Sequence, residues 1–231
     1  MIVFGVSHSK ALYSAAKSVG VTCRFFNAKA HVTKGGDGVA RLSDAFLSAA
    51  DGGGRIVSMV GGNSHNHFGL LDSGNVWDFI SPGEKRRIPR GVNLISYSAV
   101  IDVLQNSVRS HLNILKVLAT TFPGRVIHIE SPPQIGDNEY IAKSRLRAAD
   151  ITGRKSFRRT RIASPDRRRR LWLLHSDIYR DACSKFGAGF ISVPAESMDS
   201  DGFLLPEYWE NSTHANEAYG ALVLKQLEGA A

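Results

Sequence analysis

The stretch MIVFGVSHSK at residues 1–10 decides how the rest of the chain is interpreted. Apolar residues dominate positions 2–6 and a polar Ser-His-Ser follows at once, which is typical of a short buried strand that ends in a polar turn. The residues from Lys10 to Val19 then have helical spacing. A strand that runs directly into a helix is the first half of a β-α-β unit, so the opening residues predict a parallel sheet.

The same alternation of short apolar runs and longer helical patterns continues along the chain. The runs expected to be strands are Ile2 to Val6, Val21 to Phe26, Arg55 to Val60, Val126 to Glu130 and Phe190 to Val193. The segments expected to be helices are Lys10 to Val19, Leu42 to Ala50, Ala99 to Thr121, Pro165 to Phe186 and Ala215 to Leu227. This order predicts an α/β protein with three layers, α/β/α, around a five-stranded parallel sheet.

Two connections, Gly62 to Asn93 and Ser131 to Ser164, are too long for tight turns and are predicted to be irregular loops that build or cover a site. The chain has 231 residues, 43% of them hydrophobic, and no linker of low complexity, so we expect one domain over residues 1–231. No apolar run approaches the roughly 20 residues of a membrane span.

The N-terminus has no basic leader before its apolar run, so a secretory signal is not expected. The two cysteines, Cys23 and Cys183, are too few for a disulfide framework. We therefore expect a cytoplasmic protein.

Polar residues gather where ligands bind in an open parallel sheet, beyond the carboxyl ends of its strands. GVSHS follows the first strand, GGNSHNH follows the third, and ENSTHANEAYG precedes the last helix. Ser7, Asn63 and His214 are the parts that acyl transfer requires, namely a nucleophile, an oxyanion donor and a general base. Each also has a structural interpretation, because Ser7 can cap a helix, Asn63 can occupy a turn and His214 can begin a helix.

The three blocks together resemble the SGNH (GDSL-like) hydrolases, whose motifs are GDS, GxN and DxxH. The matching positions are Gly5, Val6 and Ser7, then Gly61, Gly62 and Asn63, then Asn211, Ser212, Thr213 and His214. The resemblance extends over essentially the whole chain and implies a flavodoxin-like SGNH hydrolase fold. It also implies that Ser7 attacks an ester carbonyl, that His214 accepts its proton, and that Asn63 with backbone N–H groups holds the oxyanion.

Three positions depart from the pattern of this family. Val6 and Ser64 stand where the family usually has Asp, and Asn211 stands where the triad Asp would orient the base. An amide can fix the imidazole tautomer, but it stabilises imidazolium less than a carboxylate does. A backbone carbonyl could orient His214 instead, or Asp199 or Asp201 could take the place of the missing carboxylate.

A second oxyanion donor in the family is a Gly after strand two. The candidates lie in KGGDGVA and are Gly35, Gly36 and Gly38. We expect Gly36, together with Gly62, to line the oxyanion pocket. This stretch lacks the GxxxxGKS and GxGxxG spacings of nucleotide sites, so no cofactor is expected.

His8 and His65 are candidate pocket residues near the same strand ends. With His67 they also suggest a metal site, but neither HExxH nor a CxxC pair accompanies them, so no metal is expected.

The positive charge of the chain is concentrated in one stretch. Residues 143–170 contain 12 Lys and Arg against two Asp, a local net charge of +10 in a chain of net charge +8. Arg167, Arg168, Arg169 and Arg170 could contact an anionic ligand or a membrane surface, or they could form a solvated surface. Nucleic acid binding is the least favoured alternative, because consecutive arginines spread around a helix and do not share one face.

Two functional hypotheses follow from these patterns. The first is a serine esterase or O-acyltransferase that acts on a small-molecule ester or an acylated carbohydrate. The second is a catalytically weak or inactive binding protein on the same scaffold, which contacts an anionic partner through its arginine-rich segment.

Overall fold

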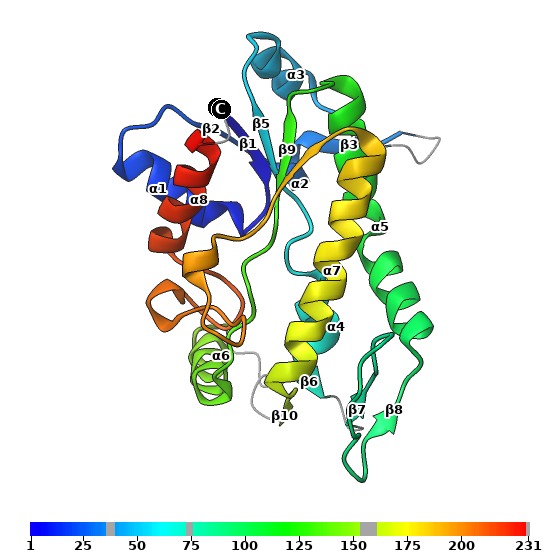
Figure 1. The fold of residues 1–231 in the computed structure, drawn as a ribbon. Helices are drawn as coiled ribbons and strands as arrows, with labels where there is room; N and C mark the ends of the chain where they lie inside the picture. The colour runs from blue at the N-terminus through cyan, green and yellow to red at the C-terminus, as the bar shows by residue number, and fades with distance from the viewer. Residues whose placement is uncertain (36–39, 73–75, 153–160, 230–231) are drawn as a thin grey trace.

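A computed structural model describes residues 1–35, 40–72, 76–152 and 161–229 (Figure 1). Its central sheet has five parallel strands in the order β11-β9-β5-β1-β2. These strands are β1 (Ile2–Gly5), β2 (Arg24–Asn27), β5 (Ile56–Met59), β9 (Val126–Ile129) and β11 (Gly189–Ile191). All five predicted strands are present, each shorter than expected, and the predicted α/β class and parallel sheet are confirmed.

Helices cover both faces of this sheet. The bounds are α1 (Ser9–Ser18), α2 (Ala28–His31), α3 (Asp44–Asp51), α4 (Ser64–Gly69), α5 (Tyr97–Thr121), α6 (Asn138–Thr152), α7 (Pro165–Phe186) and α8 (Glu217–Gly229). Figure 1 shows α1 and α8 side by side on one face, and α5 and α7 on the other. No helix in the described ranges is long and apolar enough to cross a bilayer.

Short strand pairs and turns connect these layers. The pairs are β3 (Val32–Lys34) with β4 (Ala40–Leu42), β6 (Leu71–Asp72) with β10 (Arg161–Ile162), and β7 (Trp77–Asp78) with β8 (Asn93–Leu94). Two 3₁₀ turns, Ala195–Ser197 and Pro206–Tyr208, precede α8.

The prediction that residues 62–93 and 131–164 are irregular is wrong in part, because α4 and α6 lie within them. The sequence of α4, SHNHFG, is too short and polar to give a helical period. In α6, Ile141 is fully buried but much of the helix is charged, which weakens its hydrophobic period. Helices at these positions form because tertiary contacts, such as the packing of α4 on α7, override weak local signals.

The alternation of side chains along the strands divides the core into two parts. Val3 and Val57 point to one face and pack with residues of α1 and α8. Ile2, Phe4 and Ile56 point to the other face and pack with residues of α3, α5 and α7. Because both faces are buried, every residue of β1 and β5 is buried, which explains why these strands are uninterrupted apolar runs.

Local capping fixes where the long helices begin. The Ser96 and Ser164 hydroxyls accept hydrogen bonds from the backbone N–H groups of Ala99 and Arg167, each at 3.3 Å. Such a cap stabilises a helix by about 1 kcal/mol. The cap at Ser164, with Pro165 in the first turn, confirms the predicted start of α7.

The strand order places a topological switch between β1 and β5. The chain leaves β1 toward β2 on one side and leaves β5 toward β9 on the other, so the two connections diverge. In open α/β sheets a crevice forms at this point, beyond the carboxyl ends of the two strands. The residues found there are Ser7, after β1, and Gly61 to Asn63, after β5.

Candidate active site

Ser7 and His214 meet at this edge of the sheet although 207 positions separate them in sequence. The Ser7 Oγ atom lies 2.9 Å from the Nε2 atom of His214. The packing of α8 on α1 brings the two ends of the chain together, and it depends on a close approach at Gly220. A Cβ atom on Gly220 would lie 2.1 Å from the carbonyl oxygen of Ala11, so only glycine permits this contact.

Asn211 holds the other side of the His214 ring. Its Oδ1 atom lies 3.0 Å from His214 Nδ1 and also accepts the backbone N–H groups of Thr213 and His214, each at 3.1 Å. Because Oδ1 is only an acceptor, Nδ1 carries the proton and donates it to Asn211. Nε2 is then unprotonated and can accept the hydrogen of the Ser7 hydroxyl, as a general base must.

Burial lowers the pKa of His214 below its ordinary value of 6.5, while the nearby Glu210 opposes that shift. Glu210 is itself ion-paired with Lys10 at 3.5 Å. Neither Asp199 nor Asp201 forms a hydrogen bond or ion pair with His214 within the described residues. Asp199 Oδ1 instead accepts the backbone N–H groups of Asp201 and Phe203 in a local turn. The side chains that contact His214 Nδ1 are those of Asn211, at 3.0 Å, and Thr213, whose hydroxyl oxygen lies at 3.1 Å.

The Asn63 side chain is fixed by a second amide. Asn66 Nδ2 donates to Asn63 Oδ1 at 2.7 Å. Within the described residues, no acceptor is hydrogen-bonded to the Nδ2 atom of Asn63, so this donor is available. Nothing in the described part of the chain accepts a hydrogen bond from the backbone N–H of Gly62. These two groups have the chemistry of oxyanion donors.

The turn at Gly61 is fixed by contacts with helix α7. The ring of His175 donates from Nε2 to the Gly61 carbonyl oxygen at 3.0 Å. Gly61 has a φ of +74°, and a Cβ atom there would lie 1.8 Å from the hydroxyl oxygen of Tyr179. Both the backbone angle and the space therefore require glycine at this position.

His8 and His65 have different surroundings, although the sequence groups them. His8 is buried and stacks on His214, with ring centroids 4.5 Å apart, and Gly62 leaves room for its ring. Burial, reinforced by His214, lowers the pKa of His8 to about 3, so this ring is neutral. His65 lies in the interior, where it contacts Gln134 and packs edge-on against His175.

A cavity of about 480 Å³ opens beside Ser7. It is lined by Ser7, Gly62, Asn63 and three basic residues, Lys29, His67 and His111. Gly35 is not among its lining residues, and the other two glycine candidates, Gly36 and Gly38, lie outside the described residues.

The sequence analysis missed Asn66, Lys29 and His111 as site residues. Only Asn66 had a local signal, since it lies three positions after Asn63 at the start of α4.

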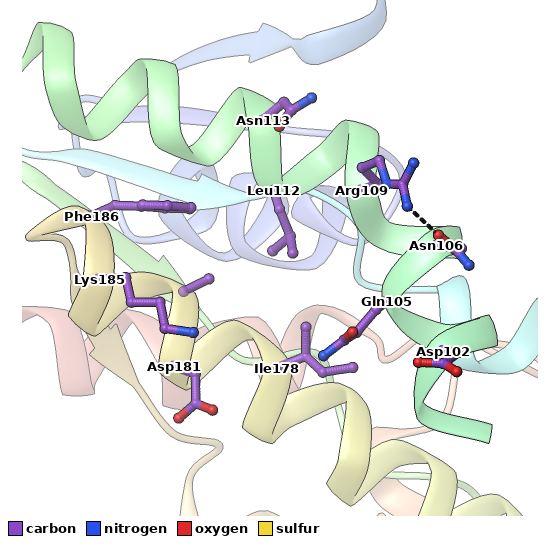
Figure 2. A pocket seen from close by; sticks show the side chains of 11 residues that line it. Asp102, Gln105, Asn106, Arg109, Leu112, Asn113, Ile178, Asp181, Lys185 and Phe186 are labelled. Carbon is purple, nitrogen blue, oxygen red and sulfur yellow. Dashed lines mark hydrogen bonds between the residues drawn. The ribbon is translucent and has the colours of Figure 1, made fainter. Parts of the chain in front are cut away.

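A second hollow, of about 620 Å³, lies between α5 and α7 (Figure 2). Its lining includes Asp102, Arg109, Asp181 and Lys185, and Figure 2 shows the hydrogen bond from Arg109 to Asn106. None of the residues at the Ser7 site lines it, and its charges are of both signs. This hollow is therefore separate from the cavity beside Ser7.

The four consecutive arginines, Arg167 to Arg170, are largely internal, which corrects the expectation of an anion-binding surface there. Residues 153–160 of the same basic stretch lie outside the described residues. Arg167, Arg168 and Arg170 are 1%, 1% and 7% exposed. Arg167 is ion-paired with Asp72, and Arg170 is ion-paired with Asp78.

The remaining two arginines of this segment are also turned to the protein. Arg168 donates to the carbonyl oxygens of Ile135 and Gly136 and to the side chain of Asn138. Arg169 is half-buried beside Gly202. The physical reason for the correction is that a buried guanidinium needs partners, and Arg167, Arg168 and Arg170 find theirs inside the molecule.

Within the described residues, no cluster of three or more His, Cys, Asp or Glu side chains could hold a metal ion. The histidines near the site contact amides, hydroxyls and each other, as His214 and His65 do.

Comparisons with known proteins identify the fold. No protein-family model and no curated protein matches the sequence. Among solved structures, a Streptococcus pneumonia protein assigned as a platelet activating factor has a TM-score of 0.50 and 14% identity, over 99% of this chain and 82% of that one. A Bacteroides fragilis protein assigned as an acylhydrolase has a TM-score of 0.48 and 11% identity, over 99% and 84%.

The carbohydrate acetylesterase Est24 from Sinorhizobium meliloti is also similar, with a TM-score of 0.42 and 9% identity, over 100% of this chain and 98% of that one. At these identities the likeness concerns the fold alone. Together with the strand order, the likeness to the Streptococcus pneumonia structure shows a shared three-layer α/β/α fold.

Proposed function

We propose that this chain, which has the fold of the SGNH/GDSL-like hydrolases, is a serine esterase with Ser7 as nucleophile and His214 as general base. The observation that carries the proposal is the 2.9 Å separation between Ser7 Oγ and His214 Nε2. A nucleophile and its base must lie within hydrogen-bond reach, and the base must have a third group that orients it. Asn211 is that third group, at 3.0 Å from Nδ1.

The reaction begins when the Ser7 oxygen attacks the carbonyl carbon of a bound ester. Its proton passes to His214 Nε2, and the carbonyl π electrons move to the oxygen, which becomes an oxyanion. When the tetrahedral intermediate collapses, the bond to the alcohol breaks and His214 gives the proton to the leaving oxygen. Water then attacks the acyl-Ser7 ester by the same steps in a second round, and the acid is released.

Asn63 Nδ2 and the backbone N–H of Gly62 are proposed to stabilise the oxyanion. The support is that Gly62 and Asn63 line the cavity beside Ser7 and that the side chain of Asn66 already donates to the side-chain oxygen Oδ1 of Asn63. A donor of this kind contributes about 3 kcal/mol to transition-state stabilisation.

His8 is proposed to act on the same base through its stacked ring. A neutral imidazole against the face of His214 excludes water from one side of the ring, at a centroid separation of 4.5 Å. Small-molecule esters, including acylated carbohydrates, are the proposed substrates, and the acyl group passes to water or to a second alcohol.

The alternative of a binding protein that uses its arginine-rich segment is disfavoured, because Arg167, Arg168 and Arg170 are engaged inside the protein. Hydrolysis of 4-nitrophenyl acetate by the purified protein tests the esterase proposal. The variant Ser7→Ala should lose at least about 10³-fold in kcat. Ser110→Ala, which removes an exposed hydroxyl from α5, is the matched control and should retain full activity.

A fluorophosphonate probe gives an independent readout that does not depend on the choice of ester. We expect one equivalent to label Ser7 in the folded protein and in the Ser110→Ala variant. Equal turnover by the wild type and Ser7→Ala, or labelling at another residue only, would overturn the proposal.

A further inference from the structure

The cavity beside Ser7 is lined by basic side chains and by no acidic one among the described residues. Lys29 comes from α2, His67 from α4 and His111 from α5, so three separate elements each contribute a basic side chain. Among the described residues that line the cavity, none is Asp or Glu. Lys29 places a positive charge at this cavity, next to Ser7, and the two imidazoles add hydrogen-bonding groups beside it.

The three basic groups are close enough to influence one another. Burial is the main cause that lowers the pKa of His111, and both His67 and Lys29 lower it further. Protonation of His111 is thus opposed by two neighbours that face it from α4 and α2, and by the loss of water around its ring. An anion bound among these groups would offset the repulsion between a protonated His111 and its basic neighbours.

Lys29, which is exposed, and His111 have no internal partner for these groups among the described residues. No hydrogen bond or ion pair joins the Lys29 ammonium to any described residue, and His111 Nδ1 is buried without a hydrogen-bond partner. By contrast, Lys10 on α1 is paired with Glu210, and the buried Arg167 is paired with Asp72. The Lys29 ammonium and the His111 ring can therefore each bind a hydrogen-bonding group of a ligand in the cavity.

We propose that the ester substrate carries an anionic group, a carboxylate or a phosphate, which the Lys29 ammonium binds together with His67 and His111. The inference rests on the proposed function, because it places the anion within the cavity that Ser7 and Asn63 also line. A charged hydrogen bond from Lys29 to an oxyanion is stronger than one between neutral groups, so it would select a charged ester over its neutral analogue.

Two matched pairs of esters test this proposal and show which part of the substrate carries the anion. In the first pair the acyl chain carries the charge: mono-4-nitrophenyl adipate is compared with its methyl ester. In the second pair the leaving group carries it: 4-acetoxybenzoate is compared with methyl 4-acetoxybenzoate. We expect kcat/KM to favour the charged member of at least one pair by about tenfold.

Lys29→Gln should reduce that preference about fivefold, and Lys29→Arg should restore it in part. Lys17→Gln, which removes the same charge from an exposed position on α1, is the control and should leave the ratio unchanged. A ratio near one for both pairs in the wild type, or a ratio that Lys29→Gln does not lower, would overturn the anion site.

Turnover of the neutral members distinguishes this failure from failure of the esterase proposal. If the neutral esters are hydrolysed without any preference for the charged ones, the anion site is wrong and the serine esterase remains. If none of the four esters is hydrolysed, the serine esterase is wrong and the anion site fails with it.

Discussion

The His214 Nδ1 atom donates to the Oδ1 atom of Asn211 at 3.0 Å, where a carboxylate would complete a triad. The amide fixes the ring and its tautomer but does not carry a charge that stabilises imidazolium. Burial meanwhile lowers the pKa of His214, and its neighbour His8 is held neutral with a pKa of about 3. The geometry around His214 is therefore that of a triad in which a neutral amide stands in place of the carboxylate.

This arrangement predicts a simple pH dependence. His214 works only when Nε2 is unprotonated, so activity is lost as the pH falls through the pKa of this ring. Because burial lowers that pKa, the midpoint of the acid limb of kcat/KM should lie below 6.5, the ordinary pKa of histidine. A pH–rate profile with 4-nitrophenyl acetate checks it, and a midpoint above 7 would contradict it.

The variant Asn211→Asp should raise activity and move the same midpoint upward. A carboxylate next to Nδ1 stabilises the imidazolium that forms in the transition state, and it raises the pKa of the ring for the same reason. We expect a gain of about tenfold or more in kcat at pH 8. Asn211→Leu, which keeps the size but removes the acceptor, should instead reduce kcat, and a Leu variant as active as the wild type would remove Asn211 from the mechanism.

Asn66 is predicted to act through Asn63. Without the 2.7 Å hydrogen bond, the Asn63 amide can rotate and its donor is less well aimed, so Asn66→Ala should lower kcat about tenfold with little change in KM. Asn63→Ala should lower kcat about 10²-fold. The double variant should be no worse than Asn63→Ala alone, and additive losses would show that Asn66 acts elsewhere.

Gly61 is predicted to be irreplaceable for reasons of both space and backbone angle. Gly61→Ala places a Cβ atom 1.8 Å from the Tyr179 hydroxyl oxygen, and we expect it to lower the free energy of unfolding by at least about 3 kcal/mol. Gly20→Ala is the control, because Gly20 has a similar φ of +72° but a Cβ atom there would have no neighbour within 4 Å. We expect it to lower the free energy of unfolding by about 1 kcal/mol. Urea denaturation measures both, and equal losses would mean that the contact with Tyr179 is unimportant.

Removing one partner of the ion pair between Arg167 and Asp72 should lower the free energy of unfolding more than removing both. Arg167→Met leaves a buried carboxylate without its partner and should cost about 3–5 kcal/mol of unfolding free energy. Adding Asp72→Leu should recover much of this loss. Arg180→Met, which breaks an exposed pair with Asp177, should cost about 1 kcal/mol or less. Similar losses for Arg167→Met and Arg180→Met, again by urea denaturation, would argue against the burial of Arg167.

The sequence alone determined the layers of the fold and the three groups at the centre of the candidate site. Strand and helix periods are local properties, so the five strands of the sheet could be found within a few residues of their ends. Ser7 and Asn63 could be placed because each directly follows a strand, and carboxyl ends of parallel strands share one edge. The helix cap at Ser164 is local in the same way.

Only the tertiary structure decided which side chains from distant parts of the sequence come into contact. Arg167 pairs with Asp72 across 95 positions of the sequence, so an arginine that the sequence places in a strongly basic stretch is buried and ion-paired in the fold. Lys29 and His111 come to one cavity from separate helices, with no spacing in the sequence that relates them. Contacts of this kind depend on how helices pack against the sheet, and packing is set by the whole chain and not by any local period.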